Sequence, residues 1–481
     1  MGILKFIGRA AKELSVVFAA LAITACASTG GPLGLSEAQE KAIGEQQHPQ
    51  IVAAFGGEMD DPHLTAYVNG IFDRLMSASE QPNADIDIYL LDSPIVNAMA
   101  LPGHVYVTRG LMSLASSEAE LAGVIGHEIG HIFKRHTAKR VSRGNLAQIG
   151  AVAAAILTGD ADTAQMVGQG AQLYLLRFSR SQEYESDLIG TRLLGASGYN
   201  PLGAAQFLNT LGAWSNLEMQ IAGVQEPPEY LKTHPNSANR VQRAAQEANA
   251  IGAGGGDVIR NGYLKRIDGM IYGDDPMKQG FIRGRDFIHP TIGIAFTVPQ
   301  GFQMRNTSQA VVAQSQSGAQ MQFTGANVEQ SPTQIIDGPL SESLGVQLSP
   351  SRAININGRN AAVGQARADT QGGQVDVTAY VIQWQGTMNY IFLWVTPANQ
   401  TRGLQQPIAQ SVQSLRTIDA RSANTPPARR IDIVTVQSSD RASSLANYMA
   451  FPSYKEERFR IMNGLPSNQE VQPGSLVKLV R

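Results

Sequence analysis

The sequence predicts an α+β protein: a mainly helical domain with a small β-sheet, then an α+β accessory domain, then a small βααβ domain. Residues 85–93 and 104–110 alternate apolar and polar side chains and predict two short strands, and residues 117–133 carry apolar side chains at helical spacing. A glycine-rich break near residue 253 precedes short β-type segments. A chain of 481 residues fits about three domains, and we place them at 26–255, 280–418 and 430–481.

The composition is that of a globular protein without a basic surface. The chain has 38 lysines and arginines against 40 aspartates and glutamates, a formal net charge of −2. This balance gives no electrostatic attraction to nucleic acid, which we therefore exclude as a partner. Partners have to be sought in the motifs.

The first 25 residues predict a lipoprotein signal peptide. A basic head precedes an apolar run from about residue 14 to residue 25, which is too short to span a membrane comfortably. Residues 23–26 resemble a lipobox, and Cys26 is the only cysteine of the chain. Lipid on Cys26 would anchor the protein to a membrane surface in the periplasm, and Ala27 after it favours the inner leaflet of the outer membrane. The alternative is an ordinary buried or free cysteine.

The segment GVIGHEIGHIFKRH, residues 123–136, predicts a metal site on a helix that begins after Ser117. His127 and His131 lie one helical turn apart and face the same way, while Glu128 is rotated by about 100°. Two imidazoles so placed bind Zn²⁺ in zincins, and the glutamate takes a proton from the metal-bound water. We predict one Zn²⁺ per chain, with Glu128 as general base.

Three glycines of the same helix, Gly123, Gly126 and Gly130, predict close packing. Each costs a helix up to about 1 kcal/mol relative to alanine. We therefore expect another backbone to lie against this face.

The third metal ligand is expected from a later helix. A metzincin would need a glycine and a histidine where the chain has Lys134 and Thr137, so that class is excluded. A zincin of the glutamate type takes a glutamate from a later helix, with an aspartate four residues on that orients a histidine. Glu183 and Asp187 have this spacing, whereas Glu185 lies on the opposite side of such a helix.

Four segments in order resemble one family. They are NAMALPGHVYVTRGLM (97–112), HEIGHIFKRH (127–136), EYESD (183–187) and THPNSANR (233–240). The chain resembles, over about 36–250, the zinc metallopeptidases that include the CAAX prenyl endopeptidase, HtpX and BepA, and its layout is most similar to that of the periplasmic branch. The resemblance implies that His127, His131 and Glu183 bind zinc, that Glu128 is the base and that Asp187 supports a ligand. It also implies that a substrate strand adds to an edge strand made of His104, Val105, Tyr106 and Val107.

Three further residues of these segments need an interpretation. His136 lies nine residues after His127, which is 2.5 helical turns, so it should point away from the metal, and we interpret it as structural. The resemblance implies that His234 can approach the zinc as a fourth ligand and hold the enzyme latent; the alternative is a loop histidine that stabilises the oxyanion or caps a helix. Arg240 is either a transition-state or a structural arginine.

The remaining segments predict accessory structure. Residues 145–178 are rich in alanine and glycine and predict a helical hairpin over the active helix, with a membrane-dipping hairpin as the alternative. Residues 376–397 predict a β-hairpin turning near Gly386, and 402–418 predict a helix. Residues 430–481 resemble a LysM module, which would bind peptidoglycan, but Ser439-Asp440-Arg441 replaces its usual Gly-Asp-Thr turn. A generic βααβ domain is the alternative.

Two functions fit these predictions. The first is a lipid-anchored zinc metalloendopeptidase that cleaves unfolded or misassembled envelope proteins. The second is a non-proteolytic chaperone or scaffold that holds such proteins at the cell wall. An intact Glu128 favours the protease, because a binding protein has no need of a base beside the metal.

Overall fold

The computed structural model describes residues 36–137, 139, 178–222, 234, 238–252, 255–307, 310–348, 350–370 and 373–481. The predicted signal peptide, the predicted lipidation of Cys26 and, apart from Phe178, the predicted hairpin of 145–178 lie outside these residues.

The chain divides into two compact units, and each is described by itself. The helical unit contains the described residues of 31–145, 171–274 and 428–481, and the β-rich unit contains those of 275–427. Helices of the helical unit are α1 (Glu37–Ala54), α2 (Pro62–Ser77), α3 (Arg109–Leu114), α4 (Glu118–Phe133), α8 (Arg180–Ala196), α9 (Leu202–Ala222), α11 (Ala238–Ala250), α12 (Arg260–Ile267), α17 (Ala442–Ala446) and α18 (Lys455–Met462). Its strands are β1 (Asp87–Leu91), β2 (Ala98–Leu101), β3 (His104–Thr108), β15 (Ile431–Thr435) and β16 (Leu476–Val480).

The three-stranded sheet of the helical unit has the order β1-β3-β2. Strand β3 runs parallel to β1 and antiparallel to β2, so both of its sides are paired. The prediction that His104, Val105, Tyr106 and Val107 form an edge strand is therefore wrong. Strand β2 is not predicted by the sequence, because its four residues, AMAL, are all apolar and show no alternation.

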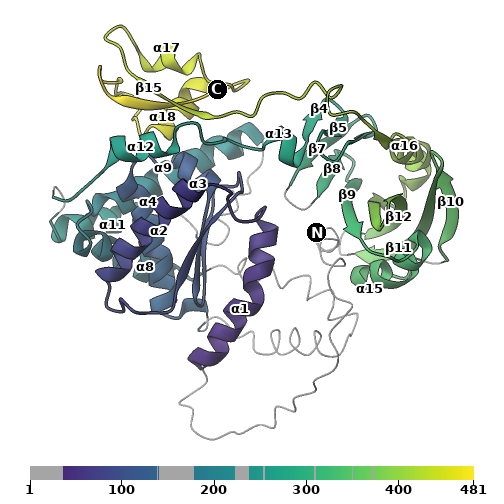
Figure 1. Cartoon of the computed structure of the whole chain (residues 1–481), viewed down its shortest axis with the longest axis horizontal. Coiled ribbons are helices and arrows are strands. Elements are labelled where there is room, and N and C mark those ends of the chain that lie inside the picture. Colours follow the sequence, from purple (N-terminus) through teal and green to yellow (C-terminus); the bar gives the residue numbers. More distant parts are fainter. Residues whose placement is uncertain are drawn as a thin grey trace, which may run out of the picture. The chain divides into compact units, whose positions relative to one another are not determined.

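Helices cover both faces of this sheet. Ile51 and Phe55 of α1 pack with Leu91, Met99 and Tyr106 on one face. Side chains of β1 and β3 on the other face belong to a larger core that includes residues of α2 and α4. In Figure 1 the sheet accordingly lies between α1 and the other helices.

The glycines of α4 allow two helices to touch its backbone. A Cβ atom on Gly123 would lie 2.9 Å from the Cα of Ala204 in α9, and one on Gly130 would lie 3.1 Å from the Cα of Ser186 in α8. Gly126 faces Gly190 of α8, with a corresponding distance of 3.2 Å. The prediction of close backbone packing is confirmed, and it brings α8 against the helix that carries both histidines.

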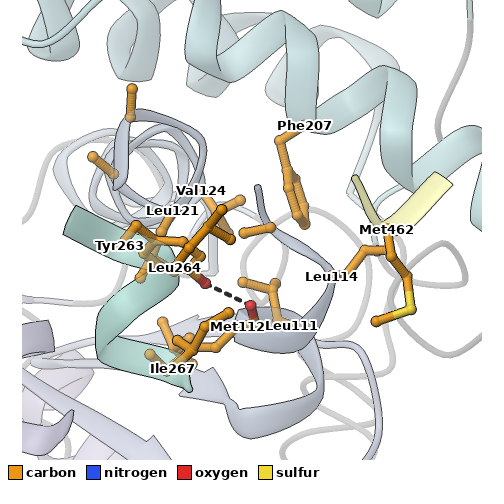
Figure 2. Packing of buried hydrophobic residues seen from close by; sticks show 14 of the residues in the cluster. Leu111, Met112, Leu114, Leu121, Val124, Phe207, Tyr263, Leu264, Ile267 and Met462 are labelled. Atoms are coloured by element: carbon orange, nitrogen blue, oxygen red, sulfur yellow. Dashed lines mark hydrogen bonds between the residues drawn. The ribbon is translucent and has the colours of Figure 1, made fainter. Parts of the chain in front are cut away.

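Residues 430–481 form a strand, two helices and a strand, in the order that the sequence predicts, and β15 pairs with β16. Their apolar side chains share one core cluster with α2, α4 and the sheet. Figure 2 shows Met462 of α18 beside Leu114 of α3. It also shows the hydroxyl of Tyr263 in α12, which donates a hydrogen bond to the carbonyl oxygen of Met112. The likeness of this segment to a LysM module stays a prediction.

One buried lysine connects this segment to α3. Lys478 of β16 is fully buried, and its Nζ donates to the carbonyl oxygens of Ser113, Leu114 and Ala115 at 3.0, 3.0 and 2.5 Å. These carbonyls end α3 and have no partner further along the helix. The last strand thus caps the helix that leads into α4.

The β-rich unit has a seven-stranded sheet, β10-β11-β12-β13-β9-β8-β7, and a four-stranded sheet, β14-β6-β5-β4. The predicted hairpin is confirmed as β12 (Gly373–Gln385) and β13 (Met388–Pro397), with Gly386 at φ +56° in the turn. The predicted helix is α16 (Thr401–Gln413).

The remaining strands are β4 (Phe281–Arg283), β5 (Asp286–His289), β6 (Ile294–Thr297), β7 (Phe302–Asn306), β8 (Val311–Ser315), β9 (Gln320–Asn327), β10 (Arg352–Ile356), β11 (Arg359–Thr370) and β14 (Arg416–Thr417). The remaining helical segments are α13 (Pro276–Gln279), α14 (Pro332–Ile335), η4 (Ile336–Leu340) and α15 (Ser341–Leu344). Among the described residues, no helix has both the length and the apolar character needed to cross a bilayer.

Candidate metal centre

Four buried side chains from three segments converge beside α4. His127 and His131 come from α4, Glu183 from α8, and His234 from the stretch before α11, and their ligand atoms all lie within 4.8 Å of one another. The Nε2 atoms of His127 and His131 are 3.0 Å apart. The structure thus brings together the three ligands predicted from the sequence, and His234 joins them.

The donor atoms suit a zinc ion. Three imidazoles and one carboxylate offer the nitrogen and oxygen ligands, four in number, that Zn²⁺ prefers. Glu183 Oε1 lies 3.4 Å from His131 Nε2 and 3.1 Å from His234 Nδ1. Burial holds the pKa of His131 well below its ordinary value, which keeps this imidazole in the neutral form that binds metals.

Glu128 lies next to this group of four side chains. Its side chain is fully buried, and neither carboxylate oxygen is hydrogen-bonded within the described part of the chain. Oε1 lies 3.8 Å from His234 Nε2. Burial raises the pKa of Glu128. A buried carboxylate without a partner is unfavourable for stability, and such groups are typical of functional sites.

Asp187 holds the first histidine. Its Oδ1 lies 2.9 Å from His127 Nδ1, which leaves Nε2 of His127 directed toward the other ligands. Burial alone would raise the pKa of Asp187, but the Arg240 guanidinium and His127 bring it below its ordinary value. This contact agrees with the supporting role expected for Asp187.

Arg240 binds both acidic residues of α8. Its Nε and Nη2 each donate to Asp187 at 2.7 Å, and its Nη1 lies 2.6 Å from Glu183 Oε2. The guanidinium is 2% exposed and also faces the carbonyl of His234 at 3.5 Å. Of the two roles considered from the sequence, this geometry favours the structural one: Arg240 positions the carboxylates.

His136 lies closer to the site than the sequence suggested. Helix α4 ends at Phe133, and Arg135 adopts a left-handed conformation with φ +52°. The chain therefore turns back, and Nδ1 of His136 comes to 3.0 Å from Nδ1 of His131. The expectation that His136 points away assumed a continuing helix and is corrected here. His136 does not belong to the group of four candidate ligands.

Two other neighbours carried no signal in the sequence. The ring of Phe178 packs on His131 with ring centroids 3.8 Å apart. Glu185, the weaker of the two candidates for the third metal ligand, instead contacts His136 Nε2 at 3.0 Å. Both contacts join segments that are distant in the sequence, and no local pattern predicts them.

Comparison with known proteins agrees with this site. Residues 62–248 match the model of peptidase family M48. A beta-barrel assembly-enhancing protease of Yersinia pestis is 32% identical over 234 residues, covering 47% of this chain and 46% of that protein. The protein of the same name from Escherichia coli K12 is 29% identical and covers 45% of each chain. Mitochondrial metalloendopeptidase OMA1 of Arabidopsis thaliana is 36% identical over 164 residues, which are 33% of this chain and 31% of its own.

The similarity is confined to one part of these proteins. The chain spans about half the length, or less, of the relatives that it matches. Among solved structures, a cyanobacterial PsbP from Synechocystis aligns with 29% of this chain and 98% of its own, at 12% identity and a TM-score of 0.24, too low to support an argument. The family match includes His127, Glu128, His131, Glu183 and His234. The part of this chain that resembles peptidase family M48 is thus residues 62–248.

Proposed function

We propose that the protein is a zinc metalloendopeptidase of the bacterial envelope. The observation that carries the proposal is Glu128, a fully buried carboxylate that has no hydrogen-bond partner among the described residues and lies beside three imidazoles and Glu183. A purely structural metal site is closed by its ligands and has no use for such a group. Bound here, Zn²⁺ would activate a water molecule and polarise the peptide carbonyl.

The residues of the chain would share the remaining work. Glu128 accepts a proton from the attacking water and returns it to the leaving amine, and its raised pKa brings both transfers closer to neutral pH. Asp187 fixes the ring of His127, and Arg240 holds Asp187 and Glu183 in place. A substrate that adds as a strand would have to pair with an edge strand of the sheet, and β2 is the edge strand that contacts α4.

We propose that His234 keeps the site latent as a fourth ligand. It is 2% exposed, and its Nδ1 lies 3.3 Å from His127 Nε2 and 3.1 Å from Glu183 Oε1. A fourth protein ligand would occupy the position that a catalytic zinc keeps for water. The enzyme would then act only after His234 has left this position.

The substrates and location are part of the same proposal. Unfolded or misassembled envelope proteins fit the printed name of the bacterial relatives, beta-barrel assembly-enhancing protease. The N-terminal signal and Cys26 support a periplasmic protein with a lipid anchor in the inner leaflet of the outer membrane. Residues 430–481 would add contact with peptidoglycan if their likeness to a LysM module extends to sugar binding.

Digestion of casein and of a misfolded porin tests this function. We expect the wild type to cleave both and Glu128→Gln to retain less than about 1% of the activity, because the loss of a catalytic base costs on the order of 10²–10⁴-fold. Glu342→Gln, an exposed glutamate of the β-rich unit, is the matched control and should cleave normally. Equal turnover by wild type and Glu128→Gln would favour the chaperone alternative, and wild-type protein without zinc by elemental analysis would exclude the metal site.

A further inference from the structure

The two metal-site histidines of α4 are supported in different ways. His127 contacts a carboxylate directly, since Asp187 Oδ1 lies 2.9 Å from its Nδ1. The Nδ1 of His131 instead faces a second imidazole, that of His136, at 3.0 Å. We propose that His136 and Glu185 form a positioning relay that orients His131 toward the metal. The proposal rests on the zinc site proposed above.

The contacts of the relay connect a partly exposed carboxylate to the candidate metal site. Glu185 Oε2, on a side chain that is 42% exposed, lies 3.0 Å from His136 Nε2. His136 is fully buried, and its other ring nitrogen lies 3.0 Å from His131 Nδ1 and 3.4 Å from Ser186 Oγ. His136 is also held through its backbone, because Gln182 Nε2 donates to its carbonyl oxygen at 3.4 Å.

Only one arrangement of protons allows His131 to bind a metal. Its Nε2 faces His127 Nε2 and Glu183 and must present a lone pair to the ion, so its proton sits on Nδ1. That N–H can donate only if His136 Nδ1 is an acceptor. The proton of His136 is then on Nε2, where it donates to the Glu185 carboxylate.

The opposite arrangement is incompatible with metal binding. If His136 Nδ1 carried the proton, it would donate to His131 Nδ1 and leave the proton of a neutral His131 on Nε2, facing the other ligands. The negative charge of Glu185 favours a proton on the near nitrogen of His136 and so selects the first arrangement. His136 thus sets the tautomer of His131, as Asp187 sets that of His127.

Two substitutions, His136→Asn and His136→Gln, each keep one of the two ring-nitrogen contacts of His136 and remove the other. In His136→Asn the amide oxygen can take the place of Nδ1 and still accept from His131, whereas in His136→Gln the amide lies near the place of Nε2 and reaches only Glu185. Loss of a group that supports a metal ligand typically weakens metal binding about 10- to 100-fold. We expect this loss for His136→Gln and zinc affinity within about threefold of wild type for His136→Asn.

Zinc affinity is measured by chelator competition on the full chain, and the thermal stability of the metal-free protein is measured beside it. Glu185→Ala, whose side chain is partly exposed, is the second variant and should weaken zinc binding less than His136→Gln, because its effect passes through one more hydrogen bond. Glu185→Gln, which can still accept from His136, should restore part of that loss. Lys134→Met is the control, because it removes a lysine that lies 3.8 Å from Glu185 and leaves the relay intact.

The outcomes separate this proposal from the proposed function. A wild type that binds no zinc overturns both. A wild type that binds zinc, with His136→Asn and His136→Gln equally impaired in zinc affinity and in metal-free stability, leaves His136 a packing residue and overturns the relay alone. If His136→Gln does not fold, Glu185→Ala decides, and wild-type zinc affinity in that variant contradicts the relay.

Discussion

Arg240 donates two hydrogen bonds of 2.7 Å to Asp187 in the interior of the helical unit, where neither residue is more than 6% exposed. The same guanidinium reaches Glu183, so one arginine from α11 balances two acidic residues of α8. The metal site therefore depends on a residue that need not touch the metal.

Removal of this arginine should destabilise the protein strongly. Arg240→Met leaves two buried carboxylates without their cation, and breaking a buried ion pair from one side costs about 3–5 kcal/mol of unfolding free energy. Urea denaturation of the metal-free protein measures the loss. Arg192→Met, which removes an arginine from an exposed pair with Glu247, should change stability by no more than about 0.5 kcal/mol. Similar losses in the two variants would contradict the role given to Arg240.

Removal of His234 should raise proteolytic activity if it acts as a plug. His234→Ala takes one of four candidate ligands from the site and frees a position for water. If at least about nine tenths of the wild-type protein is in the closed form, casein cleavage should increase about tenfold or more. A tenfold increase corresponds to a free-energy difference of about 1.4 kcal/mol between the closed and open forms. Activity that falls to the level of Glu128→Gln would instead make His234 part of the catalytic machinery.

The contact between α4 and α8 should not tolerate a single methyl group. A Cβ atom on Gly190 would lie 2.8 Å from the backbone nitrogen of His127, so Gly190→Ala should push the two helices apart. We expect a loss of about 1–3 kcal/mol in unfolding free energy, as for other overpacked sites, and weaker zinc binding. Gly70→Ala in α2 is the matched control, because nothing lies within 4 Å of its Cβ position. It should stabilise the protein by up to about 1 kcal/mol, the helix propensity gained by replacing glycine with alanine.

The buried lysine of β16 should make stability depend on pH. Burial lowers the pKa of Lys478 to about 7, against 10.5 for the ordinary side chain. Between these values the folded state binds fewer protons than the unfolded state, so the contribution of Lys478 to the free energy of unfolding increases as pH rises from about 7 toward 10. The slope is at most about 1.4 kcal/mol per pH unit.

Lys478→Met tests this dependence. Urea denaturation at pH 7, 8 and 9 should show a difference between wild type and variant that grows with pH. The comparison should be repeated in a Glu120→Gln background, because this buried carboxylate acts electrostatically on Lys478. A difference that is constant over this range would show that Lys478 keeps its proton throughout.

The sequence predicts which candidate metal ligands share a helix face, because helix periodicity fixes their relative positions. His127 and His131 have to share a face if their segment is helical, and Glu183 and Asp187 likewise. The position of His136 could not be predicted from the sequence, because it depends on the path of the chain after α4. The left-handed conformation of Arg135, rare outside glycine, brings His136 back to His131.

The pairing of strands and the burial of charge were equally hard to predict. Strand β2 has four apolar residues that could belong to any buried segment, and without it β3 looked like an edge. Lys478 lies in a strand whose neighbouring residues do not indicate a buried lysine. Its partners are the end carbonyls of a helix more than 360 positions earlier in the chain.

That separation has a consequence for biosynthesis. Helix α3 obtains its cap only when residue 478 has been translated, so the segment leading into the metal-binding helix stays unfinished while most of the polypeptide is being made. A nascent or prematurely terminated chain would contain the histidines and glutamates of the site but would lack Lys478, which caps α3. The support of the candidate metal site would thus be completed only when almost the whole chain has been made.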